Sequence, residues 1–422
     1  MNYKKTILDN GLRIITVPMK DNPTVTVFAL VEAGSKYETK EKNGISHFLE
    51  HMCFKGTTRR PSNSDISTEL DNIGSHYNAF TGEEITGYYA KAQFAHIDKL
   101  LDVITDMYLN PLFVEKEIEK EKGVIIEEIN MYEDLPQRKV QNLFTELVYG
   151  DQPAGYDIAG PKENIKGMTQ VDFINYRNKF YTAPATTIIV AGNFGEEKVV
   201  ADVTRIFSVL PKVGKGTKLP VNEGQVKPAV SLFKKETDQT HLVLGVRTFD
   251  LYDKRDKVMD VLVGVLDAGM SSRLFKKLRD EMGVCYYVSA GNQGFTDHGL
   301  FSVSAGVDNL RVKEVIKVIL GELNKFKTEL VSPEELQKVK QNLVGTMYLG
   351  LESSDSLARF YGGQEIMNKV IKKPEEIKAE IESITAEEIM SLAKEVFVDK
   401  GLNLALVGRF EDKGEFENIL KF

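Results

Sequence analysis

The sequence predicts an α+β protein built from two homologous domains, each a β-sheet packed with helices. The chain has 422 residues, whereas a single hydrophobic core seldom grows beyond about 250–300 residues. Part of the sequence is repeated, which indicates two similar domains rather than two unrelated ones. Strand-like and helical patterns are interspersed, as in α+β and α/β folds. The strand-like runs include residues 24–31, 186–191 and 241–246, and the helical patterns include residues 96–109 and 308–325.

The internal repeat is clearest towards the end of each half. Residues 169–194 and 385–410 both begin at a threonine, continue as an amphipathic helix, and end in a short apolar run before Gly-x-Phe. Threonine at the first of these positions can cap a helix. A second match joins the Gly-Tyr-Tyr-Ala segment that starts at Gly87 to the Gly-Leu-Phe-Ser segment that starts at Gly299. Its offset differs slightly from that of the first match, as loop insertions would produce.

The segment between the two copies has the composition of a connector. Residues 210–228 are rich in proline and glycine and poor in apolar side chains, which predicts an extended chain. We therefore expect a first domain over residues 1–210, a linker over 211–228 and a second domain over 229–422.

Charge and composition narrow the class of protein. Lys and Arg number 54 against 62 Asp and Glu, for a net charge of -8, which disfavours a nucleic-acid-binding protein because such a protein needs a positive face. No apolar run reaches about 18 residues, so no membrane span is expected. The polar residues 1–5 lack the apolar core of an export signal. Since Cys53 and Cys285 make no disulfide framework, we expect a cytoplasmic protein in which both are buried small hydrophobic residues.

The first domain contains a metal-ligand pattern, His47-Phe-Leu-Glu-His51. On a helix, 100° per residue places His47, Glu50 and His51 on one face. Phe48 and Leu49 fall on roughly the opposite face, which predicts that the helix packs its apolar side in the core. Two imidazoles one turn apart are what a zinc site needs. Glu50 lies between them and is placed to hold water, in the inverted order of the His-Glu-x-x-His motif.

A third zinc ligand has to come from elsewhere, because catalytic zinc usually takes three protein ligands. The helical pattern over residues 115–132 contains Glu121 and Glu128, which share a face bordering its apolar stripe. Glu127 points nearly opposite, and the other acidic residues of this run indicate a solvated face. Periodicity therefore leaves Glu121 and Glu128 as alternatives.

These motifs resemble the pitrilysin, insulin-degrading enzyme and mitochondrial processing peptidase family of inverzincin zinc peptidases. The resemblance spans nearly the whole chain and indicates a short, half-length member of that family. It is carried by residues 44–58, 78–81, 124–128 and 270–275.

The resemblance implies a role for each motif residue. One zinc ion per chain is expected on His47, His51 and Glu128, with Glu121 as a supporting carboxylate that orients the ligands. Glu50 is expected to act as general base, accepting a proton from the attacking water and passing it to the leaving amine.

It also implies substrate contacts from both domains. An edge strand of the family pairs with the substrate backbone, and it maps onto Asn78, Ala79, Phe80 and Thr81. Arg279 and Tyr286 match an Arg and a Tyr that approach the zinc site from the other half of the enzyme. Tyr286 is expected to donate to the oxyanion and Arg279 to hold the substrate backbone.

The second copy lacks the metal motif. Asp260, Val263 and Gly264 stand opposite His47, Glu50 and His51 when the copies are aligned. We therefore expect no metal in the second domain. The other histidines, at positions 76, 96, 241 and 298, are expected to be structural.

The expected function is that of a zinc endopeptidase acting on unstructured peptides. The family encloses its substrate in a chamber of two halves, and this chain resembles one half. Because it carries both the metal residues and the Arg/Tyr pair, we expect a homodimer with its sites shared in trans, with a heterodimer as the alternative. Two other functions stay open: a non-catalytic scaffold such as the respiratory-complex core subunits, and a maturation enzyme for a single precursor peptide.

Overall fold

The computed structural model describes residues 2–422, which form two compact units. Each unit takes most of one half of the chain and a short segment of the other half. The division at a linker over residues 211–228 stays a prediction, although neither helix nor strand lies between Phe207 and Ala229. Within the described residues, unit 1 comprises residues 2–129, Tyr156–Leu219 and Leu349–Lys372, and unit 2 comprises Asn130–Gly155, Pro220–Tyr348 and Lys373–Phe422.

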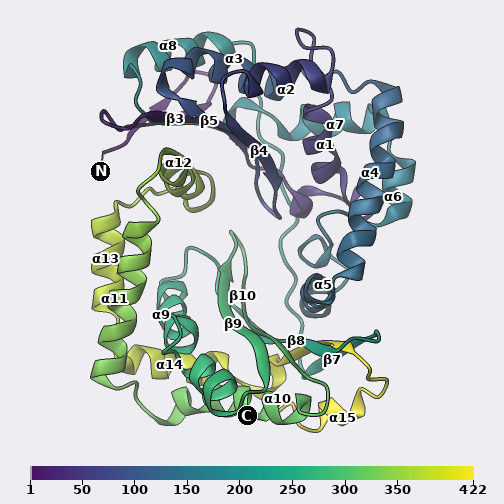
Figure 1. Ribbon diagram of the computed structural model, residues 1–422, viewed down its shortest axis with the longest axis vertical. Coiled ribbons are helices and arrows are strands. Elements are labelled where there is room, and N and C mark those ends of the chain that lie inside the picture. The colour runs from purple at the N-terminus through teal and green to yellow at the C-terminus, as the bar shows by residue number, and fades with distance from the viewer. Residues whose placement is uncertain (1) are drawn as a thin grey trace. The chain divides into compact units, whose positions relative to one another are not determined.

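Unit 1 is built on a 6-stranded sheet in the order β1-β2-β6-β3-β5-β4 (Figure 1). Strands β2 and β6 are parallel, and the other neighbouring strands are antiparallel. The predicted run 24–31 is β3, and 186–191 lies in β6. Strand β4, which contains Asn78 to Thr81, forms one edge of the sheet. The bounds are β1 Lys4–Ile7, β2 Arg13–Pro18, β3 Thr24–Val31, β4 His76–Thr81, β5 Thr86–Gln93 and β6 Thr186–Gly192.

Helices cover both faces of this sheet, because the strands alternate apolar residues towards each side. The face of Val27 and Ala29, called the α1 face here, shares a hydrophobic core with α1, α3, α7 and α8. The opposite face, called the α12 face, contains Leu30 and Ile189, which pack against α12 at Gly362. Figure 1 shows α3 and α8 on one side of the sheet and α12 on the other. The helices of unit 1 are α1 Ile45–Cys53, α2 Asn63–Asp71, α3 Ile97–Leu109, α6 Lys162–Gly167, α7 Gln170–Phe180, α8 Glu196–Phe207 and α12 Ser354–Gly363, with most of α4 Glu115–Asp134.

Unit 2 is built on a 5-stranded sheet in the order β7-β11-β8-β10-β9. Its β7 and β11 are parallel and the other pairs antiparallel. This arrangement repeats β2-β6-β3-β5-β4 of unit 1 strand for strand, so the predicted duplication and fold class are confirmed. The Gly87 and Gly299 segments lie in the equivalent strands β5 and β10. The bounds are β7 Ala229–Lys234, β8 Gln239–Thr248, β9 Cys285–Gly294, β10 Gly299–Asp308 and β11 Asn403–Gly408.

The helices of unit 2 include one from the first half of the chain. Helix α5 packs on β8 and β11, and the hydroxyl of Tyr149 at its end donates to the carbonyl of Gly299, 2.9 Å away. Conversely, helix α12 comes from the second half of the chain and belongs to unit 1. This exchange explains why the units are discontinuous, and no sequence pattern predicted it. The helices are α5 Pro136–Tyr149, α9 Arg255–Asp267, α10 Val312–Thr328, α11 Pro333–Leu349, α13 Pro374–Ser383, α14 Ala386–Val396 and α15 Gly414–Glu417.

Both repeated threonines begin helices as predicted. The backbone N–H of Thr169 donates to the Asp172 carboxylate at 2.9 Å, and that of Thr385 donates to Glu388 at 2.8 Å. These capping boxes satisfy groups that a helix start leaves unpaired. The predicted helix 308–325 begins later, at Val312, because β10 continues to residue 308.

The two cysteines are free thiols in different environments. Cys53 is fully buried, as expected. Cys285 is only partly buried, so the expectation was wrong for this residue, because it starts the edge strand β9. Among residues 2–422, no helix is both long and apolar enough to cross a bilayer.

Candidate active site

Helix α1 holds the three residues of the predicted metal motif. It begins after Gly44, whose φ of 99° is seldom adopted by residues with a side chain. Phe48 and Leu49 are fully buried in the core, and they fix the helix so that His47 and His51 share the other side. The two imidazole rings lie 4.7 Å apart, centre to centre, at an angle of 72°.

A buried carboxylate, Glu38, holds the start of α1. It accepts the backbone N–H of Ser46 at 2.7 Å and of Gly44 at 2.8 Å, and the side-chain amide of Asn43 at 2.9 Å. Burial raises the pKa of Glu38 to about 7, while the hydrogen bonds from Ser46, Asn43 and Gly44 oppose the rise. A carboxylate at this point satisfies the orphan N–H groups of the first turn and complements the helix dipole.

Helix α4 brings the third candidate ligand to the two histidines. Its Ile118 and Ile125 are buried, which turns the neighbouring acidic face towards α1. Oε2 of Glu128 lies 3.6 Å from Nε2 of His47 and 3.6 Å from Nε2 of His51. Helical periodicity left Glu121 and Glu128 as alternative third ligands. The structure separates them, because Glu121 contacts the other ring nitrogen of His51, Nδ1, at 2.9 Å.

The donor set fits a zinc ion. His47, His51 and Glu128 each offer one ligand atom, and these atoms lie within 4.8 Å of one another. Tetrahedral zinc with bonds of about 2.0–2.1 Å requires its ligand atoms to be about 3.3–3.4 Å apart. The two separations of 3.6 Å need only a small contraction to meet this. Glu50 is not part of the cluster, and its expected role as general base stays a prediction.

The two imidazoles differ in protonation, and that of His47 suits a metal ligand. Burial lowers the pKa of His47 to about 4, and the neighbouring His51 adds to the effect, so its ring is neutral. For His51, burial lowers the pKa, but the hydrogen bond to Glu121 and the charges of Glu50, Glu121 and Glu128 raise it overall.

Glu121 orients the ring of His51. Burial raises its pKa, but hydrogen bonds from His51 and Lys55 outweigh this and lower it overall, so the carboxylate is ionised. Nδ1 of His51 therefore donates to this carboxylate, and Nε2 is the ring nitrogen that faces Glu128. Lys55 at 2.5 Å pairs with the second oxygen of Glu121. A carboxylate that fixes the tautomer of a histidine is a regular partner of metal ligands.

Glu50 lies beside the cluster and is buried. Burial raises its pKa, while the hydroxyl of Thr81 and the charge of His51 lower it. That hydroxyl donates to Oε2 of Glu50 at 2.6 Å. The contact joins α1 to the edge strand β4. A carboxyl group with a raised pKa is suited to accept and return a proton near neutral pH.

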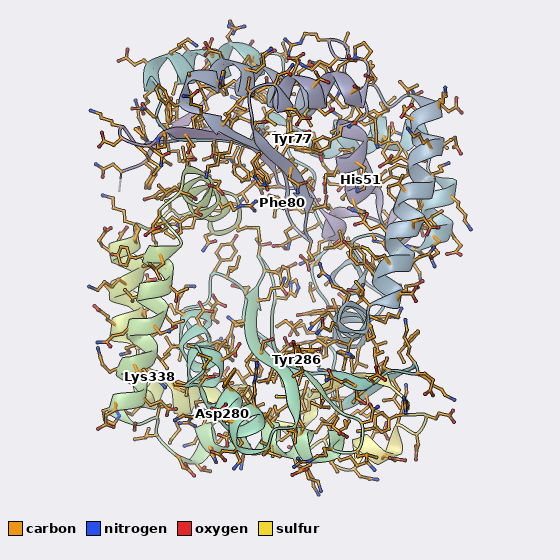
Figure 2. All side chains as sticks on the ribbon, viewed as in Figure 1. His51, Tyr77, Phe80, Asp280, Tyr286 and Lys338 are labelled. Carbon is orange, nitrogen blue, oxygen red and sulfur yellow. The ribbon has the colours of Figure 1, made fainter. Side chains whose placement is uncertain are left out.

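The residues Asn78 to Thr81 lie on the free edge of the sheet. Tyr77 and Ala79 pack against the core on the α1 face, and Thr81 points to the same face. By alternation, Asn78 and Phe80 point to the α12 face. Figure 2 labels Phe80 on β4 and His51 on α1. The edge position suits backbone pairing with a peptide, although this role stays a prediction.

Arg279 and Tyr286 lie in unit 2. Arg279 is in a π-helical turn, Phe275–Glu281, with its guanidinium 5.0 Å from the ring centre of Phe275. Tyr286, labelled in Figure 2, is 74% exposed on β9. Pairing of β9 with β10 skips Tyr286, so this residue is the extra one of a β-bulge. Bulges re-aim side chains and occur often beside active sites.

The positions aligned with the metal motif, Asp260, Val263 and Gly264, lie on α9. Asp260 accepts hydrogen bonds from Asn292 at 3.0 Å and Lys257 at 2.8 Å. A Cβ on Gly264 would come within 2.6 Å of Val339 on α11. Within residues 2–422, the cluster of His47, His51 and Glu128 is the one group of His, Cys, Asp and Glu residues that could hold a metal.

Sequence reasoning missed Glu38 and Lys55, and it placed Thr81 on the substrate strand without its contact with Glu50. Helical and strand periodicity show which residues share a face of one element, but they do not predict these contacts. The other histidines lie outside the cluster. His76 is exposed on β4, His96 ends a 3-10 turn, His241 contacts the Tyr287 hydroxyl at 3.0 Å and His298 contacts Asp297 at 2.8 Å.

Solved structures share the fold over almost the entire chain. A protease from Helicobacter pylori superposes with a TM-score of 0.91 at 23% identity, over 96% of this chain and 99% of that one. A structure of a peptidase M16 inactive domain from Pseudomonas fluorescens gives 0.89 at 16% identity, over 97% and 99%. At these identities the similarity shows the fold alone.

Sequence comparisons give the family. The model of insulinase, peptidase family M16, matches residues 13–162, and that of the peptidase M16 inactive domain matches residues 167–343. An uncharacterized zinc protease of Bacillus subtilis (strain 168) is 35% identical over 399 residues, which are 94% of this chain and 96% of that protein. One of Rickettsia felis is 34% identical over 406 residues, 94% and 95% of the two chains. The chain is therefore a member of peptidase family M16, the insulinase family.

Proposed function

We propose that this chain is a zinc endopeptidase that hydrolyses unstructured peptides, with one zinc ion per chain. The observation that carries the proposal is the meeting of His47, His51 and Glu128 with the buried carboxyl of Glu50 beside them. Both relatives named above are described as zinc proteases, which supports the same chemistry here.

The residues around the cluster divide the catalytic work. His47, His51 and Glu128 would hold the zinc ion, whose Lewis acidity would polarise a peptide carbonyl and acidify water. Glu121 holds the ring of His51 in the ligating tautomer. The Thr81 hydroxyl occupies Oε2 of Glu50, which leaves Oε1 to accept a proton from the attacking water and return it to the leaving amine.

The edge strand β4 is the proposed docking site for the peptide backbone. Asn78, Ala79, Phe80 and Thr81 lie along the free edge, where an extended peptide can add as a further strand. Thr81 touches Glu50, so a peptide paired with this end of β4 lies next to the general base. Backbone pairing makes few demands on sequence, which favours unstructured peptides as substrates.

We further propose that the enzyme acts as a homodimer that encloses the substrate in a chamber. In this proposal Arg279 holds the substrate backbone and Tyr286 donates to the oxyanion, both acting on the metal site of the partner. The exposure of Tyr286 in a bulge supports a role outside the core of its own unit. A cytoplasmic location is proposed as well, supported by the two free thiols.

The decisive experiment compares wild type with Glu50→Gln on a quenched fluorescent peptide, with zinc content measured on the same samples. We expect the variant to keep its zinc and to lose on the order of a thousandfold or more in kcat/KM, because proton transfer is removed. Equal cleavage by a zinc-loaded Glu50→Gln would contradict the mechanism. Wild type without zinc and without cleavage would favour the non-catalytic scaffold, and cleavage of one precursor alone would favour a maturation enzyme.

The dimer is tested by mixing two inactive variants. Glu50→Gln lacks the general base, and Arg279→Ala lacks the proposed substrate contact. If sites are shared in trans, a mixed dimer contains one intact site, so activity returns after the variants are unfolded and refolded together. Analytical ultracentrifugation checks that dimers form. A mixture that stays inactive while mixed dimers form would contradict the shared site.

A further inference from the structure

The α12 face of unit 1 carries a cation held by three aromatic rings. The guanidinium of Arg359, on α12, lies 5.3 Å from the ring centre of Phe28, 5.5 Å from that of Phe80 and 4.8 Å from that of Tyr89. The rings of Phe28 and Tyr89 stack on each other, 4.7 Å apart with an interplanar angle of 14°. These four residues are called the Arg359 patch here. Three of them come from the sheet and the fourth from the exchanged helix.

The positive charge of this patch is not neutralised. Arg359 is exposed, and no carboxylate within residues 2–422 pairs with it. The acidic residue one turn earlier on α12, Asp355, is engaged by Lys91 at 2.6 Å and by the Ser353 hydroxyl at 2.7 Å. Contacts with ring faces leave the N–H donors of a guanidinium for bidentate hydrogen bonds, for which a carboxylate is the matching acceptor.

The patch borders the edge where a substrate strand would pair. Phe80 is next to Thr81 on β4, but its ring lies on the α12 face whereas the Thr81 hydroxyl reaches Glu50 on the α1 face. A peptide added to this edge alternates its side chains between the two faces. Those on the α12 face become cross-strand neighbours of Asn78 and Phe80, at about 4.5–5.5 Å between Cβ atoms. A long side chain at such a position reaches Arg359.

We propose that the Arg359 patch binds a carboxylate of the peptide substrate, supplied by an Asp or Glu side chain or by the peptide C-terminus. The inference rests on the proposed function, because it takes the peptide to lie along β4. Arg359 donates to the carboxylate, while Phe28, Phe80 and Tyr89 hold the guanidinium in place and cover the aliphatic part of the side chain. The patch thereby selects which segment of a peptide stops beside Glu50.

The test uses two sets of quenched peptides. In the first, a single Glu is moved through each position of a neutral peptide and compared with Gln at the same position. In the second, a free C-terminus is compared with its amide at varied distance from the cleaved bond. We expect one position or one C-terminal length at which the carboxylate raises kcat/KM about threefold to tenfold over its neutral counterpart. The first set reports a side-chain source and the second a C-terminal one.

Variants assign the preference to Arg359. In Arg359→Gln the carboxylate-to-neutral ratio should fall to about one, and in Arg359→Lys part of it should remain, because lysine keeps the charge without the planar fork. Because the ratio is taken within one variant, a partial loss of folded protein does not affect it. The matched control is Arg205→Gln, which removes the same charge from α8 on the α1 face and should leave the ratio unchanged.

Two outcomes would overturn the proposal. One is a wild-type ratio near one at every position and length, and the other is a preference that survives in Arg359→Gln or disappears equally in Arg205→Gln. Binding of the same peptides to Glu50→Gln, measured by fluorescence anisotropy, separates this proposal from the proposed function. If wild type cleaves nothing but the Arg359-dependent preference appears in binding, the subsite stands and the peptidase activity is wrong.

Discussion

The two units share one strand order but differ where a helix pair meets beside the sheet. In unit 1, α1 and α4 meet through polar groups, with Glu121 on one nitrogen of His51 and Glu128 near the other. In unit 2, α9 and α11 meet through apolar contact, because Gly264 lets Val339 approach where unit 1 has a histidine.

This difference shows that the fold does not depend on the metal residues. Unit 2 builds the same sheet with Val339 and its neighbours in the core. Burying carboxylates and imidazoles costs desolvation free energy, and apolar packing of similar volume is often at least as stable. We therefore expect changes in the polar cluster of unit 1 to affect the proposed activity far more than folding.

The largest expected effect comes from removing the third ligand. Glu128→Gln takes away the carboxylate that faces Nε2 of both His47 and His51. We expect loss of bound zinc and a fall in kcat/KM on the order of a thousandfold or more. Zinc analysis and peptide cleavage measure both. Glu127→Gln, one residue away and exposed, is the matched control, and an equal loss in that variant would break the assignment.

A smaller but still large effect is expected in unit 2. Tyr286→Phe removes the proposed oxyanion donor from an exposed bulge, so kcat should fall about a hundredfold with zinc content and folding unchanged. Tyr252→Phe removes a hydroxyl from another exposed tyrosine of unit 2 and should behave as wild type. Unchanged kcat in Tyr286→Phe would mean that unit 2 contributes no donor to the reaction.

Glu121→Gln should weaken zinc binding about tenfold to a hundredfold, because the ring of His51 loses its carboxylate partner. The pH dependence gives a second signal. Glu121 helps to raise the pKa of His51, so in wild type protons begin to compete with zinc above the pH expected for a free imidazole. Without Glu121 that pKa falls, and the onset of zinc loss moves to lower pH.

Titration of zinc with a fluorescent chelator across pH 5 to 8 measures this shift. Glu119→Gln, on the same helix and paired with Lys122 at 2.6 Å, is the control and should leave both the affinity and its pH profile unchanged. An onset that does not move in Glu121→Gln would mean that this carboxylate does not control the protonation of His51.

The smallest expected effect tests the apolar contact between α9 and α11 in unit 2. Gly264→His introduces the residue of unit 1 into unit 2, where a Cβ meets Val339 at 2.6 Å. We expect the free energy of unfolding to fall by about 1–3 kcal/mol with no gain of zinc. Gly321→His, at a helix glycine with nothing within 4 Å, should leave stability nearly unchanged. Thermal unfolding of both variants measures the difference. If Gly264→His were as stable as Gly321→His, α11 would not be packed against α9.

Whether a contact of the site could be predicted depends on how far apart its residues lie in the sequence. His47, Glu50 and His51 share one face of one helix, so helical periodicity was enough to group them. Glu121 and Glu128 also share a face, and therefore only tertiary structure separates the residue near both Nε2 atoms from the one on Nδ1.

The features that escaped the sequence all depend on distant segments. Thr81 on β4 donates to Glu50 on α1, and the bulge at Tyr286 depends on the pairing of β9 with β10. Arg359 contacts three aromatic rings of the unit 1 sheet because α12 belongs to that unit. The exchange of α5 and α12 likewise leaves no local pattern, since both helices are amphipathic wherever they pack. In contrast, β3, β6 and the capped helices of the repeat follow from short-range signals and were predicted.

The central claim is that unit 1 alone binds zinc, through His47, His51 and Glu128. Anomalous diffraction at the zinc edge from crystals of the zinc-loaded protein tests it most directly. The expected result is one peak per chain, bonded to Nε2 of both histidines and to a carboxylate oxygen of Glu128, with no peak on α9. A peak coordinated by Glu121 in place of Glu128, or one located in unit 2, would contradict the account.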